Sequence, residues 1–420
     1  MSSTNVGHLR RATPHRQRED RPVWVSAVAG LCASLVGLGL ARFAYTPLIP
    51  ALISAKWFSP ADAVYLGAVN LAGYLAGALV ARELGARLGS VHTLRAMMVL
   101  ASLTCFACSV PVSFIWFFGW RFLAGVTGGV IMVLAASTIL PHIAPGKRGF
   151  VGGVIFAGVG LGVAASGTLV PLLLQQGLKQ SWYGLGLLSA VLTLVSWKAW
   201  PAEAHATEGA PDAHLPSRGR SLTIVRVLSA EYGLNALALV PHMVFLVDFV
   251  ARGLGQGISA GSHYWVLYGI GATVGPLLTG HLADRAGFGP ALRVAFLVEA
   301  IAILLPALSS APAAMIVSSI IVGGFTPGIV PLVLGRIHEL LPHSSSGQRA
   351  AWAQATTTFA LFQAAGAYGL SYLFARTGGD YAVLFVIGAV AVAASLAVDL
   401  VTALTIGRER KPSGASLPGE

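Results

Sequence analysis

The stretches LGARLGSVHTLR (residues 84–95) and LADRAGFGPALR (residues 282–293) are two copies of one pattern, and the second lies 198 residues after the first. Leu, Arg, Gly, Leu and Arg fall at the same places in both copies. A gap-free repeat over this distance predicts a chain built from two related halves. The same shift also superposes three glycine pairs outside the two stretches: Gly73 on Gly271, Gly77 on Gly275 and Gly125 on Gly323.

The composition assigns these halves to a membrane. Of the 420 residues, 55% are hydrophobic and only 10% are charged, whereas a soluble domain has about 25% charged residues. The 50 glycines suit close contact between membrane helices. The fold class is therefore predicted to be an all-α polytopic membrane protein. The three cysteines lie in apolar runs and are predicted to be buried structural residues: Cys32, Cys105 and Cys108.

Apolar runs of the length that a membrane helix needs, about 20 residues, recur throughout the chain. Their number indicates twelve transmembrane helices in two six-helix bundles. The expected spans are 23–51, 61–83, 92–112, 114–140, 149–175, 182–200, 222–250, 262–283, 290–310, 312–336, 350–375 and 380–406.

Basic residues set the expected orientation. If the N-terminus is cytoplasmic, inside segments hold 21 Lys and Arg and outside loops hold four, as the positive-inside rule requires. Both termini are thus predicted to be cytoplasmic, in a multi-pass protein of the cell inner membrane. This distribution explains the basic net charge without nucleic acid. The expected division is a disordered tail (1–22), a first bundle (23–200), a cytoplasmic linker (201–221), a second bundle (222–407) and a tail (408–420).

Two motifs resemble one large family. The second-half copy of the repeat contains G-x-x-x-D-R-x-G at Gly280, Asp284, Arg285 and Gly287, and RFLAGVTGG (residues 121–129) has an R-x-x-x-G pattern. Both resemble motifs of the major facilitator superfamily. GLGLARFAYTPLIPAL (37–52) and AEYGLNALALVPHMVFLVDF (230–249) are similar to its YbfB-type bacterial branch.

The resemblance implies a mechanism and a place for the site. It implies alternating access, with spans 1, 4, 7 and 10 around a central cavity and the hairpin motif as a cytoplasmic gate. The first-half hairpin departs from the pattern because Ala86 stands where the second half has Asp284. The family's proton-driven drug exporters carry a Gly-Pro pair in span five, and this chain lacks it there. That departure weakens efflux of amphiphiles as a function.

Polar residues inside apolar spans are costly and are functional candidates. Glu231, Asn235 and His242 are spaced to share one face of span seven, and Arg42 and Arg121 lie inside spans one and four. Each arginine either binds an anion through its planar fork or holds helices together by pairing with an acid such as Glu231 or with helix carbonyls. Glu299 in span nine is expected to hydrogen-bond to a neighbouring span. The predicted substrate-binding residues are Arg42, Tyr45, Asn70, Tyr74, Arg121, Tyr232, Asn235 and Gln363; Glu231 and His242 are the predicted proton-coupling residues.

These features predict a monomeric secondary transporter that carries a small organic molecule and is driven by protons. The two arginines favour an anionic substrate such as an organic acid. Efflux of drug-like amphiphiles is the alternative, and a membrane sensor or scaffold on the same fold is the alternative from another class. The sequence shows no G-x-x-x-x-G-K-[ST] motif for ATP and no clustered carboxylates or histidines for catalysis. We therefore expect no enzyme activity, cofactor, metal or nucleic-acid partner.

Overall fold

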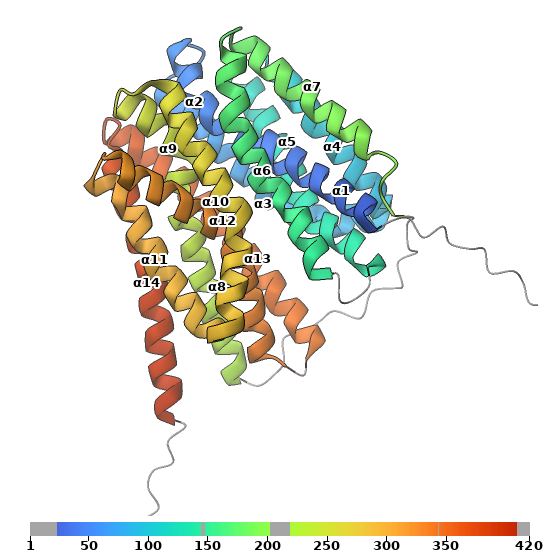
Figure 1. The fold of residues 1–420 in the computed structure, drawn as a ribbon, viewed down its shortest axis with the longest axis vertical. Coiled ribbons are helices and arrows are strands. Elements are labelled where there is room, and N and C mark those ends of the chain that lie inside the picture. Colours follow the sequence, from blue (N-terminus) through green and yellow to red (C-terminus); the bar gives the residue numbers. More distant parts are fainter. Residues whose placement is uncertain (1–22, 144–147, 202–218, 343, 410–420) are drawn as a thin grey trace, which may run out of the picture.

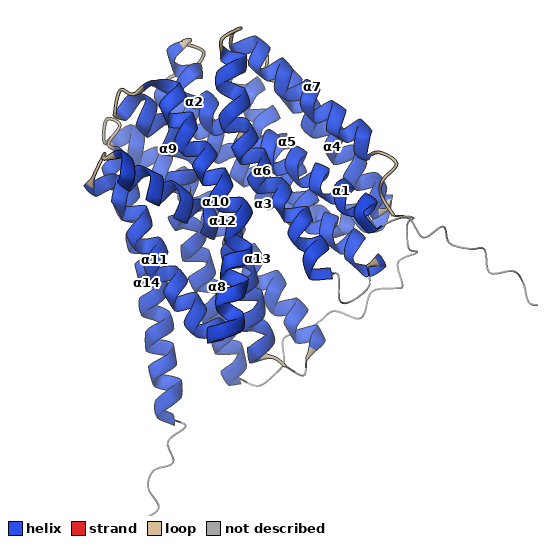
Figure 2. Ribbon diagram, viewed as in Figure 1, coloured by secondary structure: helices blue, strands red, loops and turns tan. Residues whose placement is uncertain are grey.

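The computed structural model describes residues 23–143, 148–201, 219–342 and 344–409. Within these ranges the secondary structure is helical, with short turns between helices and no strand (Figure 2). The helices form twelve rods arranged as two groups, one blue to green and one yellow to red (Figure 1). The predicted tails and linker fall largely outside the described residues.

The first group holds six rods, and its first rod is built from three segments. These are α1 (Val23–Ser34), the π-helix η1 (Leu35–Phe43) and α2 (Tyr45–Ser54). The other rods are α3 (Pro60–Leu88), α4 (Ser90–Ala107), α5 (Phe114–Ile139) with the 3₁₀ turn η2 (Leu140–His142), α6 (Arg148–Leu174) and α7 (Leu178–Ser196).

The second group repeats this plan. Its first rod joins α8 (Gly219–Ala238), the π-helix η4 (Pro241–Phe245), α9 (Leu246–Asp248) and the π-helix η5 (Phe249–Gly253). The following rods are α10 (Gly257–Ala286), α11 (Phe288–Leu308), α12 (Pro312–Leu340), α13 (Ser345–Arg376) and α14 (Tyr381–Glu409).

Each predicted span corresponds to one rod, so the twelve-helix prediction is confirmed, although some predicted ends lie beyond the helix: span 92–112 overruns α4, and span 182–200 overruns α7. In the described part, ten rods are long and apolar enough to cross a bilayer by length and composition. The remaining two, α7 and α13, complete the repeated pattern. Local chemistry sets several ends: Ser59 Oγ accepts a hydrogen bond from Asp62 N (3.1 Å) at the start of α3, as an N-cap residue does.

The glycine repeat found in the sequence has a direct structural meaning. A Cβ atom on Gly73 would collide with the Phe122 carbonyl in α5, and a Cβ on Gly271 would collide with the Ile320 carbonyl in α12. Phe122 and Ile320 are themselves 198 positions apart. The α3–α5 and α10–α12 pairs therefore use the same close backbone packing, in which glycine replaces a side chain. Gly77, Gly125, Gly275 and Gly323 make equivalent contacts.

The hairpin turns of the two groups also match. Gly89 ends α3 with φ of 84°, and Gly287 ends α10 with φ of 82°. Glycine adopts this left-handed region at no steric cost. The repeated motif thus encodes the same turn twice.

The π-helical segments lie next to prolines in both groups. Pro47 lies in α2, four residues after Phe43 ends η1, and Pro241 begins η4. A proline lacks the backbone N–H and its ring crowds the preceding turn of a regular α-helix, so a wider turn relieves both problems. Single wide turns of this kind often occur at functional sites.

The interface between the two groups is formed mainly by two pairs of helices and by the ends of the two first rods that α2 and α9 form. α6 packs on α10 and α3 packs on α13, and α2 contacts η4, α9 and α10. By contrast, α1 and α8 pack chiefly on helices of their own group. The interface is therefore closed where α2 meets η4 and α9.

Candidate functional site

Arg42 lies in the last turn of the π-helix η1 and reaches across the interface between the two groups. Its Nη2 donates to Gln363 Oε1 of α13 at 2.8 Å. Its guanidinium lies over the Tyr74 ring of α3, 4.8 Å from the centroid. The side chain is buried, and Nε has no hydrogen-bond partner. Among the described residues Arg42 forms no ion pair, so the predicted alternative of pairing with Glu231 does not occur in this conformation.

Arg121 of α5 is a second buried arginine beside the first. Its Nη1 donates to the Ala41 carbonyl at 2.8 Å, and its guanidinium lies 4.1 Å from the centroid of the Tyr45 ring. Its Nε also lacks a partner. Within the described part of the chain, neither arginine meets a carboxylate within ion-pair distance.

A small cavity joins the two arginines. Its volume is about 20 Å³, enough for about one water molecule. Asn70 donates from Nδ2 to the Arg121 carbonyl at 3.1 Å, and its Oδ1 is buried without a partner. The residues around this cavity therefore carry two N–H donors without a partner, Nε of Arg42 and Nε of Arg121, and one acceptor without a partner, Oδ1 of Asn70. The cavity is lined by Arg42, Phe43, Tyr45, Thr46, Gly67, Asn70, Leu71, Arg121, Met243 and Val244.

An aromatic wall continues from Arg42 into the second group. The ring of Phe43 lies 6.0 Å from that of Trp265, which stacks on Tyr268 at 4.8 Å. Trp265 Nε1 donates to Ser166 Oγ at 3.1 Å, and Tyr268 hydrogen-bonds Thr326 of α12. Rings from α10 therefore flank the arginines, and sequence reasoning did not select them. Aromatic residues in an apolar helix gave no signal separable from ordinary packing.

The polar stripe of span seven faces elsewhere. Asn235 Nδ2 donates to Glu299 Oε2 of α11 at 2.6 Å, which matches the expected hydrogen bond of Glu299 to a neighbouring span. His242 Nε2 contacts Ser318 Oγ of α12 at 2.7 Å. From span seven, Met243 and Val244 line the cavity instead, since the wide turn at Pro241 changes which side chains follow one face.

The other two predicted residues of this span also pack within the second group. Tyr232 lies against α13, with its ring 4.4 Å from that of Phe359. Glu231 is buried, and its backbone carbonyl accepts a hydrogen bond from Ser395 of α14 at 3.0 Å. Among the described residues its carboxylate has no hydrogen bond or ion pair. The predicted substrate-binding set thus divides: Arg42, Tyr45, Asn70, Tyr74, Arg121 and Gln363 lie together, while Tyr232 and Asn235 lie apart.

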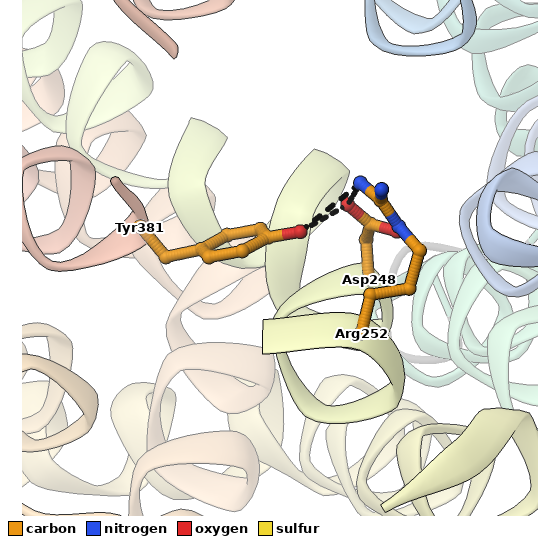
Figure 3. A network of polar contacts seen from close by, with 3 residues as sticks. All are labelled: Asp248, Arg252 and Tyr381. Atoms are coloured by element: carbon orange, nitrogen blue, oxygen red, sulfur yellow. Dashed lines mark hydrogen bonds and ion pairs between the residues drawn. The ribbon is translucent and has the colours of Figure 1, made fainter. Parts of the chain in front are cut away.

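A contrasting cluster occupies the end of span seven (Figure 3). Asp248 accepts from Arg252 Nε and Nη2, each at 2.5 Å, and from Tyr381 Oη at 2.6 Å. Asp248 is fully buried, whereas Arg252 is 27% exposed. Both carboxylate oxygens are satisfied, so the cluster ties η5 to the start of α14 and offers no free group to a ligand.

The predicted gating motif lies at the end of α10. Gly287 supplies the turn, while Asp284 and Arg285 are exposed. In the described part of the chain, Asp284 makes no hydrogen bond or ion pair. The neighbouring contacts belong to other residues: Glu339 of α12 accepts from Phe288 N at 3.2 Å and pairs with Arg336 at 2.8 Å.

The architecture defines a class: a twelve-rod helical membrane protein of two related halves with polar groups buried at their interface. A family model described as an uncharacterised MFS-type transporter, YbfB, matches residues 34–400. The chain belongs to this YbfB-type family of major facilitator superfamily transporters.

A solved structure supports the fold. A crystal structure of a variant of the nucleoside transporter NupG has a TM-score of 0.71 with 13% sequence identity. The match covers 90% of this chain and 99% of that one. At this identity the likeness establishes the fold alone. No curated protein matches the sequence significantly.

Proposed function

We propose that this protein is a secondary active transporter that carries a small anionic organic molecule across the bacterial inner membrane by alternating access, coupled to protons. The observation that carries the substrate class is the pair of buried guanidiniums, Arg42 and Arg121, around one cavity. Each has a free Nε, and neither has a carboxylate partner among the described residues. Buried charge without compensation is costly, and a bound carboxylate would supply it.

The chemistry of the guanidinium group favours a carboxylate or a similar planar anion. Arginine presents several N–H donors in a rigid fork that matches two carboxylate oxygens. Asn70 Oδ1 adds one buried acceptor that suits a hydroxyl or amine hydrogen of the same ligand. The aromatic wall of Phe43, Trp265 and Tyr268 provides an apolar surface for the remainder.

The contacts between the two groups support alternating access. Tyr65 of α3 meets Tyr368 of α13 with ring centroids 6.2 Å apart, and Thr46 Oγ1 donates to the Met243 carbonyl at 2.6 Å. These contacts lie toward the end predicted to be extracellular. The cavity of about 20 Å³ is too small for an organic acid. We assign the structure to an inward-facing state in which the arginine site is contracted.

Proton coupling is the second part of the proposal. The second group holds ionisable side chains buried away from the arginines, including the predicted pair Glu231 and His242. Such groups inside a membrane are proton-relay candidates. Ser318 Oγ donates to the Ala302 carbonyl at 2.6 Å, so it accepts from His242 Nε2–H. That arrangement leaves the buried His242 Nδ1 as an unpaired acceptor, as a neutral ring requires.

Uptake into proteoliposomes tests the substrate class. The panel contains labelled mono- and dicarboxylic acids, nucleosides and cationic amphiphiles, each with and without an inward proton gradient. We expect uptake of an acid, and we expect Arg42→Gln to lower apparent affinity about 10- to 100-fold. A charge-assisted hydrogen bond contributes about 1.5–3 kcal/mol, and 1.4 kcal/mol is tenfold.

The matched control is Arg376→Gln, which removes an exposed guanidinium that stacks on Tyr372. It should leave uptake unchanged. Uptake of nucleosides or amphiphiles but of no acid would overturn the anion proposal. So would an Arg42→Gln protein that folds normally and transports acids with unaltered affinity.

A further inference from the structure

Glu299 is a carboxyl group in the middle of α11, far from both ends of the helix. Its side chain is fully buried. Asn235 Nδ2 of α8 donates to its Oε2 at 2.6 Å. Its second oxygen, Oε1, is buried with no partner, and so is Oδ1 of Asn235. The pair therefore leaves two oxygen atoms unsatisfied in the interior of the second group.

No cation compensates this carboxyl group. Among the described residues Glu299 forms no ion pair, and the nearest arginine along its own helix, Arg293, pairs with Asp399 of α14. An ionised carboxylate in a dry interior with a single hydrogen bond would bear an uncompensated desolvation cost of several kcal/mol. A protonated carboxyl avoids this cost because it carries no charge.

We propose that Glu299, held by Asn235, is a proton-binding site of the second half of the protein. Asn235 occupies Oε2 as a donor, so Oε2 acts as the carbonyl oxygen and the proton lies on Oε1. In the step itself, the ionised carboxylate takes a proton from hydronium when water reaches Oε1, which gives a neutral acid and water. Release returns that proton to water and leaves the carboxylate hydrogen-bonded to Asn235.

The surroundings fit a proton better than a metal cation. α11, which carries Glu299, packs on α10, α12 and α14. Within the described residues no cluster of three or more His, Cys, Asp or Glu exists to hold a metal. A metal cation would need about six oxygen ligands, whereas this pair offers two. The ionisable side chains buried on the surrounding elements are Glu231, Tyr232, His242, Tyr268 and Asp399. Of the arginines there, Arg293 pairs with Asp399 and Arg336 pairs with Glu339.

The pair also connects to the span that closes the arginine cavity. Asn235 and His242 belong to the same rod, and His242 reaches α11 through Ser318 and the Ala302 carbonyl. Met243, the next residue, lines the cavity beside Arg42. If the proposed function holds, protonation of Glu299 thus acts on the rod whose Met243 accepts a hydrogen bond from Thr46 of the first group and contacts Gln363, the residue that binds Arg42.

Infrared difference spectroscopy tests proton binding without any substrate. The full-length protein in liposomes is titrated with acid and base, and the C=O stretch of protonated carboxyl groups is recorded in H₂O and D₂O. We expect one D₂O-sensitive band that disappears in Glu299→Gln and persists in Glu83→Gln, a matched change at an exposed glutamate. Asn235→Ala should shift the band, because the hydrogen bond to Oε2 is lost.

Several results would overturn the assignment. The band could persist in Glu299→Gln, or disappear in Glu231→Gln alone, which would place the proton on Glu231. A band that disappears when choline chloride is replaced by sodium chloride at constant pH would identify a sodium site. If Glu299→Gln fails to fold, the Asn235→Ala shift decides: an unshifted band excludes the pair.

Transport separates this inference from the proposed function. With an acid from the panel as probe, Glu299→Gln should abolish accumulation driven by a proton gradient but retain exchange between equal pools. A lost infrared band with normal proton-driven accumulation would confirm the proton site and remove it from coupling. Failure of every acid to be transported would leave the infrared result intact, since that result needs no substrate.

Discussion

The two halves of the molecule share their backbone packing but differ in the charge they bury. At a constant shift of 198 residues, Gly73 and Gly271 meet equivalent carbonyls, and Gly89 and Gly287 make the same turn. Yet Arg121 in the first half corresponds to Ser319 in the second. The first half buries cations, and the second buries carboxyl groups and a histidine. The packing is thus the same in both halves where helices touch, while the buried polar residues differ between the halves.

The shared packing should give the largest effect when it is broken. Gly125→Leu would place a side chain against the Asn70 carbonyl, and Gly323→Leu would place one against the Tyr268 carbonyl. The two helices of a pair cannot move apart to admit the leucine without breaking their contacts with other helices. Such overpacking of a core costs about 1–3 kcal/mol or more. We expect both variants to lose the monodisperse peak in size-exclusion chromatography.

The control for this prediction lies on the same helix. Gly119 of α5 has no heavy atom within 4 Å of an added Cβ. Gly119→Leu should therefore elute and melt like the unaltered protein. Equal behaviour of all three variants would show that the glycine repeat does not set the packing.

The next effect concerns a buried charge that is fully paired. Asp248→Asn removes the carboxylate that Arg252 and Tyr381 share. Removing one partner of a buried ion pair destabilises a protein by about 3–5 kcal/mol. Because Arg252 is partly exposed to solvent, we expect a loss of stability near the lower end of this range. We expect a clearly lower melting temperature in detergent and unaltered affinity for a transported acid. A large loss of affinity without a change in stability would mean that the cluster contacts substrate.

The sequence predicted the frame of this fold more completely than its site. Twelve apolar runs, the glycine repeat and the hairpin glycines are local signals, and the structure confirms each as a helix or turn. The direction in which a side chain points depends on the rotation of its helix about its own axis. The π-helical segments η1 and η4 alter that rotation. For this reason the Arg42 neighbourhood was largely identified from single spans, whereas Asn235 and His242 lie toward α11 and α12. Tyr268 and Trp265 were missed because an aromatic residue in an apolar helix is not distinctive.

A third prediction separates function from stability at the arginine site. Arg42→Met keeps similar length and removes a buried charge that has one side-chain hydrogen bond. Replacing even a paired set of buried charges by apolar side chains of similar volume is often neutral or stabilising by about 1–4 kcal/mol, and an unpaired charge has less to lose. We expect an equal or higher melting temperature together with at least tenfold weaker uptake of an acid. A destabilised variant with normal uptake would instead make Arg42 a structural link to Gln363.

The smallest effect on stability is expected at the hairpin that distinguishes the halves. Asp284 is exposed and without a bonding partner in the described part of the chain, and Ala86 takes the equivalent place in the first half. Surface substitutions of this kind usually change stability by no more than about 0.5 kcal/mol. Asp284→Ala should therefore melt at the same temperature as the unaltered protein.

If the motif closes a gate in the other conformation, Asp284→Ala should exchange an acid more slowly. Ala86→Asp should not restore that rate in Asp284→Ala, because it places the carboxylate beside Arg87 at the end of α3 and not beside Arg285 at the end of α10. Full rescue by Ala86→Asp would show that the two hairpins are interchangeable, and an unchanged rate in Asp284→Ala would remove the gate.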